Sequence, residues 1–220
     1  KVNINITGKV KKDGEKQALE AMKIWKIFFK DSYSIFIDLF YSQNSSRIYN
    51  LDKELLSTNY DPLCYHTLPI PEIENPDVYN CFDLFTNMEL MEDEENLYFD
   101  EKKKKFIKSY KEIKFWSLPK ILIVVLKRFL KNGNKIDKKV TFPLENLDLC
   151  KYCVGYKKNT YKYDLFAISN HIGNLNSGHY YAYCKMEDNN WYNFNDTSVS
   201  IINQDDLITE NAYCLFYKKK

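Results

Sequence analysis

The sequence is poor in residues that interrupt regular structure, with six glycines and six prolines among 220 residues. No signal peptide is visible in these residues, and the longest apolar run, ILIVVL at residues 121–126, is far too short to span a membrane. The 32 basic and 30 acidic residues nearly cancel, so the chain has no overall attraction to nucleic acid or to a membrane surface. We therefore expect neither a membrane protein nor a Lys- and Tyr-rich nucleic-acid binder.

Cysteines are also few and scattered, six in the whole chain, which excludes the disulfide framework of a small secreted domain. Free thiols indicate a reducing compartment, the cytoplasm or the nucleus. Because the chain begins with Lys1 rather than with Met, we expect it to be a piece of a longer protein.

Aromatic residues are abundant, at 16% of the chain, and most are the strand-favouring Tyr and Phe. Residues 16–30 place apolar side chains three and four positions apart, which predicts an amphipathic helix. A second, short helix is predicted with Asn75 as its N-cap and Pro76 at its first position, ending near Thr86.

The rest of the chain reads mainly as strands. Residues 34–41 (SIFIDLFY) are predicted to be a strand, 45–62 a hairpin ended by Asp61-Pro62, and 91–106 an exposed linker or hairpin. The apolar run 119–130 predicts a strand buried on both faces, followed by a turn at Asn132-Gly133. Further strands are expected in segments 63–71, 160–171, 179–186, 189–200 and 211–219. Strands at short spacing with few helices predict an α+β fold with a predominantly antiparallel sheet.

One histidine stands where a glycine loop meets a strand, in NSGHYYAYC at residues 176–184. In an antiparallel pair the start of one strand lies beside the end of the next, so His179 is expected to face Asn195 or Asp196. Such a partner fixes the imidazole tautomer and leaves the other ring nitrogen free to accept a proton. A buried structural histidine is the alternative explanation.

Four stretches in order resemble the ubiquitin-specific proteases, a family of papain-like deubiquitinating cysteine proteases. They are SIFIDLFYSQ, WSLPKILIVVLKRF, YDLFAISNHIGNLNSGHYYAYC, and WYNFNDTSV followed by AYCLFY, and the resemblance runs from about Ala21 to Tyr217. It implies a thumb, palm and fingers fold. The expected division is a helical flank at 1–33, fingers at 34–115 and palm at 116–220, with the thumb largely absent.

The resemblance also implies roles for individual residues. His179 would be the catalytic base and Asn195 its orienting partner, with Asp196 assisting; an amide orients the imidazole but cannot offset its positive charge. The loop 173–178, including Gly178, would border the cleft for the ubiquitin tail, and Tyr180 would help to line it. His171 is expected to hold this loop by hydrogen bonding. No metal or organic cofactor is required.

The chain departs from the family pattern at the nucleophile. The family carries it in an Asn-Thr-Cys type stretch that opens a helix, and this sequence has no such stretch. We expect the nucleophile to lie outside this chain and the chain alone to be inactive. Four cysteines are interpreted as small core residues, namely Cys64, Cys81, Cys184 and Cys214.

A second departure concerns zinc, which many relatives bind in the fingers through two Cys-x-x-Cys pairs. The equivalent positions are Asn50, Lys53, Phe99 and Lys102, none of which is a thiol. We expect fingers without zinc. The one Cys-x-x-Cys of the chain, Cys150 to Cys153, has no second pair nearby and is interpreted as two free thiols on a loop.

The sequence thus predicts the carboxyl-terminal part of a deubiquitinating cysteine peptidase, which cleaves after the terminal glycine of ubiquitin. Its partners would be ubiquitin and ubiquitinated proteins. The alternative is a ubiquitin-binding module without catalysis.

Overall fold

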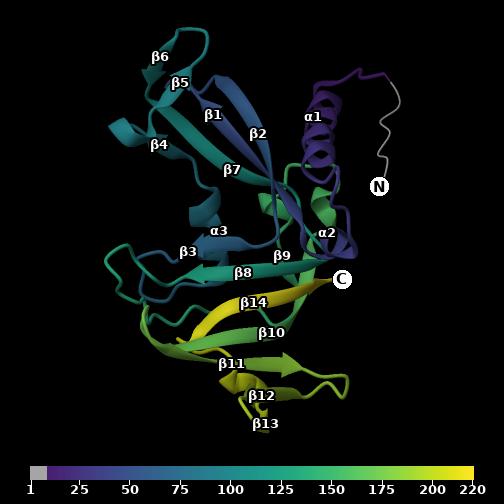
Figure 1. Cartoon of the computed structure of the whole chain (residues 1–220), viewed down its shortest axis with the longest axis vertical. Helices are drawn as coiled ribbons and strands as arrows, with labels where there is room; N and C mark the ends of the chain where they lie inside the picture. Colours follow the sequence, from purple (N-terminus) through teal and green to yellow (C-terminus); the bar gives the residue numbers. More distant parts are fainter. Residues whose placement is uncertain (1–8) are drawn as a thin grey trace.

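The computed structural model describes residues 9–220, which form two main sheets, a separate two-stranded hairpin and three α-helices (Figure 1). The larger sheet has the order β13-β12-β11-β10-β14-β8-β3, with β9 paired to β10. All of its pairs are antiparallel except that of β3 with β8. Its strands are β3 (His66–Pro69), β8 (Ile121–Lys127), β9 (Leu147–Asp148), β10 (Lys162–Gly173), β11 (Gly178–Lys185), β12 (Trp191–Asn195), β13 (Ser198–Ile202) and β14 (Ala212–Lys219). The predicted α+β fold with a mainly antiparallel sheet is confirmed.

The smaller sheet has the order β2-β1-β7-β4 and extends away from the larger one, with the β5–β6 hairpin beyond it (Figure 1). Its strands are β1 (Ser42–Tyr49), β2 (Leu55–Leu63), β4 (Glu89–Met91) and β7 (Ser109–Ser117), and the hairpin consists of β5 (Tyr98–Asp100) and β6 (Lys105–Ile107). Both predicted hairpins are present. The first one continues past Asp61-Pro62, contrary to prediction, because β2 is an edge strand, where proline is tolerated.

The helices are α1 (Asp13–Phe28), α2 (Ile35–Phe40) and α3 (Val78–Thr86), with short 3₁₀ turns η1 (Glu94–Asn96), η2 (Cys150–Tyr152), η3 (Lys158–Thr160) and η4 (Gln204–Asp206). The predicted α1 is confirmed. None of the helices in residues 9–220 is long and apolar enough to cross a membrane.

Two local predictions about helices are wrong. Residues 35–40 form α2 rather than a strand: Ile37 is buried, and Phe36 stacks on Phe40 one turn later, so packing overrides the strand preference of β-branched and aromatic residues. The N-cap of α3 is Asp77 rather than Asn75. Its carboxylate accepts a hydrogen bond from the Asn80 amide at 2.7 Å, and the Asn80 side chain accepts one from the Asp77 amide.

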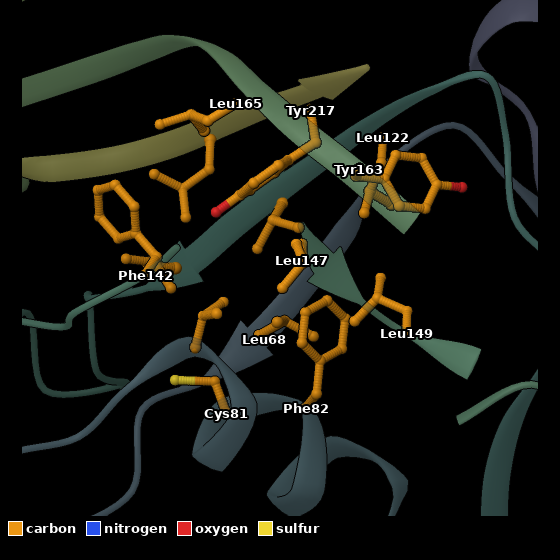
Figure 2. Close-up of a cluster of buried hydrophobic side chains, with 14 of the residues drawn as sticks. Leu68, Cys81, Phe82, Leu122, Phe142, Leu147, Leu149, Tyr163, Leu165 and Tyr217 are labelled. Carbon is orange, nitrogen blue, oxygen red and sulfur yellow. The ribbon is translucent and has the colours of Figure 1, made fainter. Parts of the chain in front are cut away.

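The core lies on one face of the larger sheet, under α3 and the segment around β9 (Figure 2). Strand β8 was predicted to be buried on both faces, but only Leu122, Val124 and Leu126 are fully buried, while the alternating side chains are partly exposed. The buried rings of Tyr163 and Tyr217 donate from their hydroxyls to the carbonyls of Pro119 and Pro143. The sheet is thus covered on one side and rigidly held.

His66, at the start of β3, is buried where the two sheets join. Its ring packs on Phe115 at 4.8 Å. Its Nε2 lies 2.8 Å from Ser42 Oγ, which donates to the Leu63 carbonyl and therefore accepts the proton of Nε2. Burial lowers the pKa of His66 to about 4, so the folded protein holds this ring neutral.

We expect acid to destabilise the protein through His66. The unfolded chain binds a proton at this ring below a pH of about 6.5, whereas the folded chain does so only near 4, so stability falls as the pH drops between these values. The loss should reach about 3 kcal/mol at pH 4. Urea denaturation at several pH values checks it, and the difference between wild type and His66→Gln should shrink as the pH falls. An unchanged difference would contradict the assignment.

Candidate functional site

The candidate site is formed by three neighbouring strands of the larger sheet. His179 is the second residue of β11 and pairs with Ile172 of β10, and Asn195 is the last residue of β12. Since β11 and β12 are antiparallel, the start of one lies beside the end of the other. His179 Nε2 lies 2.6 Å from Asn195 Oδ1, one of the two partners that the strand pattern left open.

This contact fixes the protonation of the neutral ring. Asn195 Oδ1 is a carbonyl oxygen and can only accept, so His179 Nε2 carries the hydrogen and donates it. Nδ1 is then the unprotonated nitrogen, and the side chain is 46% exposed. The ring is therefore oriented by the protein and can accept a proton at Nδ1.

Asp196 lies beside the pair without displacing Asn195. Its Oδ2 is 4.0 Å from His179 Nε2, and its side chain is 78% exposed. The residue takes a left-handed backbone conformation, with φ of 51°, in the turn between β12 and β13. A carboxylate at this distance favours a positively charged imidazole, but solvent weakens the interaction.

The loop 173–178 joins β10 to β11 next to His179. Asn174 Oδ1 accepts from the amides of Asn176 and Ser177, at 2.9 Å each, and the Asn174 amide donates to the Ser177 carbonyl. Gly173 has φ of +117°, and a side chain there would meet the Ser177 carbonyl at 2.5 Å. The loop is thus a tight turn that needs glycine at its start.

Gly178 gives space to a neighbouring histidine. A Cβ at this position would collide with the His171 ring and approach the Ile172 carbonyl to 2.7 Å. We expected the His171 side chain to hold the loop by hydrogen bonding. Its Nδ1 is instead buried without a hydrogen-bond partner among residues 9–220. The ring packs instead on Tyr180, at 4.6 Å, and on Phe129. Tyr180 is the cross-strand partner of His171 in the β10–β11 pair, whereas Phe129 comes from a segment far away in the chain, and sequence reasoning missed that contact for this reason.

All six cysteines are free, and none hydrogen-bonds to His179 in the structure. Burial raises the pKa of the Cys81 thiol to about 12 and that of Cys214 to about 11. Burial also raises the pKa of Cys150, Cys153 and Cys184. Of the four cysteines expected in the core, Cys81 is buried, whereas Cys64, Cys184 and Cys214 are only partly buried. Cys153 is buried in the core rather than placed on a loop, because the 3₁₀ turn η2 folds it inward.

The β1–β2 and β5–β6 hairpins contain the four positions that the resemblance assigns to zinc ligands, namely Asn50, Lys53, Phe99 and Lys102. Asn50 and Glu54 exchange two hydrogen bonds of 2.8 Å across the β1–β2 turn, and Phe99 packs on Phe106 across β5 and β6. Residues 9–220 hold no cluster of three or more His, Cys, Asp or Glu side chains suited to a metal ion.

The sequence is similar to known proteins along almost its whole length. The family model described as "Ubiquitin carboxyl-terminal hydrolase" matches residues 8–217. Ubiquitin carboxyl-terminal hydrolase 9 of Arabidopsis thaliana is 38% identical over 150 residues, which are 66% of this chain and 16% of that protein. Ubiquitin carboxyl-terminal hydrolase 4 of Mus musculus is 41% identical over 144 residues, which are 64% of this chain and 15% of that protein.

Solved structures share the fold. A chain of the yeast SAGA DUB module with an Sgf73 mutant matches with a TM-score of 0.75 and 28% identity, over 94% of this chain and 48% of that one. A chain of the Ubp8/Sgf11/Sus1/Sgf73 module bound to ubiquitin aldehyde matches with a TM-score of 0.73 and 28% identity, over the same shares. The present chain thus spans about half of these solved chains and less than a fifth of the curated relatives. A match that runs through both sheets and nearly end to end shows that the chain belongs to the ubiquitin carboxyl-terminal hydrolases, among the ubiquitin-specific proteases.

Proposed function

We propose that this chain is the carboxyl-terminal part of a deubiquitinating cysteine peptidase, with His179 as its general base. The observation that carries the proposal is the 2.6 Å contact between His179 Nε2 and Asn195 Oδ1, which orients a half-exposed imidazole with Nδ1 free. A ring held in one tautomer beside an open surface is what nucleophilic catalysis by a thiol requires.

In the proposed reaction a cysteine thiol loses its proton to His179 Nδ1 and attacks the carbonyl carbon of ubiquitin's terminal glycine. The leaving amine takes that proton from the imidazolium and departs, which leaves a thioester. Water then loses a proton to Nδ1 and cleaves the thioester, and the thiol is regenerated. Asn195 holds the ring throughout, and the Asp196 carboxylate, 4.0 Å away, favours the imidazolium that forms.

We place the nucleophile on a part of the protein outside this chain. The raised pKa values of Cys81 and Cys214, caused by burial, make these thiols poor nucleophiles near neutral pH. The His179 ring contacts Asn195 and Asp196 through Nε2 rather than a thiol. On this proposal the chain alone is inactive.

Ubiquitin is the proposed partner, together with the proteins that carry it. A similar solved chain belongs to a module bound to ubiquitin aldehyde. We assign the smaller sheet to the fingers and the larger one to the palm, and we propose that Gly178 and Tyr180 border the cleft for the ubiquitin tail. The free state of all six cysteines favours a reducing compartment, the cytoplasm or the nucleus.

The function is tested with a ubiquitin derivative that has a thiol-reactive electrophile at its carboxyl end. We expect it to label the full-length protein and not residues 1–220 alone, because the base is present in both and the nucleophile only in the former. Binding of ubiquitin to the full-length protein without labelling would replace the enzyme by a ubiquitin-binding module. Labelling of residues 1–220 would place the nucleophile among the six cysteines.

The roles of Asn195 and Asp196 can be separated by replacing each with alanine. Asn195→Ala removes the bond that orients the ring and should lower kcat about 10–100-fold with little change in KM. Asp196→Ala removes only an exposed charge and should lower kcat less than tenfold, with an effect that shrinks at high salt. Steady-state kinetics of the full-length protein at two salt concentrations measure both. A larger effect of Asp196→Ala would give the carboxylate the main role.

A further inference from the structure

The residues that follow β8, 128–136, form a second turn beside the loop 173–178. Its backbone pairs at three points: Ile136 donates to the Arg128 carbonyl at 2.7 Å, Leu130 to that of Asn134, and Gly133 to that of Leu130. Gly133 lies at the tip with φ of +83°, and a Cβ built there would be 4.0 Å from the Leu175 side chain in the loop 173–178. The two turns therefore adjoin.

Lys135 in this connection reaches the end of β10. Its Nζ donates to the His171 carbonyl at 2.8 Å and lies 3.4 Å from Asp137 Oδ1. Its side chain is only 7% exposed, whereas that of Asp137 is 68% exposed. Burying an ammonium group costs free energy unless it is hydrogen-bonded. The hydrogen bond to the His171 carbonyl therefore contributes more to holding Lys135 in place than the longer contact with the exposed Asp137 carboxylate.

His171 connects Lys135 to the candidate site, because it accepts the Lys135 hydrogen bond and packs against residues next to His179. Its own amide donates to the Asn211 carbonyl at 2.9 Å, so its backbone is held from both sides. Its ring packs between Phe129 and Tyr180, and it occupies the space left by Gly178. Gly178 and Tyr180 flank His179 in sequence, so the position of His171 determines where the start of β11 lies.

We propose that Lys135 is a positioning residue that locks the loop 173–178 and the Tyr180 ring in the form that receives the ubiquitin tail. This inference rests on the proposed function. Lys135 does not touch His179 or the reacting atoms. The His179 ring is held separately by Asn195 on β12, so loss of Lys135 should weaken substrate binding much more than the chemical step.

The test compares Lys135→Met with Lys138→Met in the full-length protein. Lys138 is a matched control, because it lies in the same connection and also donates to a backbone carbonyl, that of Ile73 at 2.7 Å, in another part of the fold. With a ubiquitin substrate that has a fluorescent leaving group, Lys135→Met should raise KM roughly tenfold, with kcat within about twofold of wild type. Lys135→Arg keeps the charge and donors and should lie closer to wild type.

Hydrogen exchange of residues 172–180 provides a readout that does not need activity. Exchange there should become faster in Lys135→Met and stay unchanged in Lys138→Met. Equal effects of the two substitutions, an unchanged KM, or unchanged exchange would overturn the role of Lys135. If wild-type protein hydrolyses no ubiquitin substrate, the proposed function fails, and exchange alone then decides whether Lys135 holds the loop.

Discussion

Replacement of His179 by alanine is expected to lower kcat/KM of the full-length protein by about 10²–10⁴-fold, the usual contribution of a general base. The substitution removes the imidazole that the structure orients for proton transfer, and Asn195 cannot replace it because it has no basic atom of its own. Release of a fluorescent group from the carboxyl end of ubiquitin measures the loss.

Two controls separate a catalytic from a structural effect of His179→Ala. The side chain is about half exposed, so its removal should change the free energy of unfolding by less than about 1 kcal/mol. Affinity for ubiquitin should remain within about twofold of wild type, because the imidazole serves the reaction rather than binding. Near-normal turnover would remove His179 from the mechanism, and loss of folding or of ubiquitin affinity would make its role structural.

Replacement of Arg128 by methionine is expected to cost about 3–5 kcal/mol of stability, a large share of the total for a single domain. The fully buried guanidinium donates to three carbonyls, those of Ala212, Ile136 and Lys138, at 2.7–2.8 Å. Methionine fills similar space but leaves the buried Ala212 carbonyl and the partly buried carbonyls of Ile136 and Lys138 without this donor. Each buried acceptor left without a donor costs about 1–3 kcal/mol.

Urea denaturation of the chain measures this effect, with Lys127→Met as the matched control. Lys127 precedes Arg128 in sequence, but its side chain is exposed at the end of β8, so its replacement should change stability by less than about 0.5 kcal/mol. The Nη2 of Arg128 has no hydrogen-bond partner among residues 9–220, and this unpaired donor reduces the net stability that Arg128 contributes to the wild type. A cost below about 1 kcal/mol would show that the carbonyls find other donors.

The spacing of residue types along the chain was sufficient to predict elements that form between neighbouring residues. The helix α1 follows from its apolar spacing, and the β1–β2 and β10–β11 hairpins follow from strand patterns around short polar turns. Residues 35–40 show the limit of this reasoning. Their composition favours a strand, but Ile37 is buried as part of a helix, and no periodicity distinguishes the two over six residues.

The candidate site was likewise predictable only in part. The meeting of His179 with Asn195 was predictable, because antiparallel neighbours bring the start of one strand to the end of the next. The sequence left open whether Asn195 or Asp196 makes the contact, since a strand pattern does not specify side-chain distances. Only the structure gives 2.6 Å for the first and 4.0 Å for the second.

By itself, then, the sequence determined the antiparallel fold, the family resemblance and the strand ends that carry His179 and Asn195, since these depend on residue types at short, regular spacing. The tertiary structure alone decided the burial of Arg128, the bond from Lys135 to His171 and the space that Gly178 leaves for that ring. The bonds of Arg128 to Ala212 and of Lys135 to His171 join segments tens of residues apart, and Gly178 meets His171 across a hairpin whose register the sequence does not specify. Such contacts arise from packing of the whole chain, which no local pattern encodes.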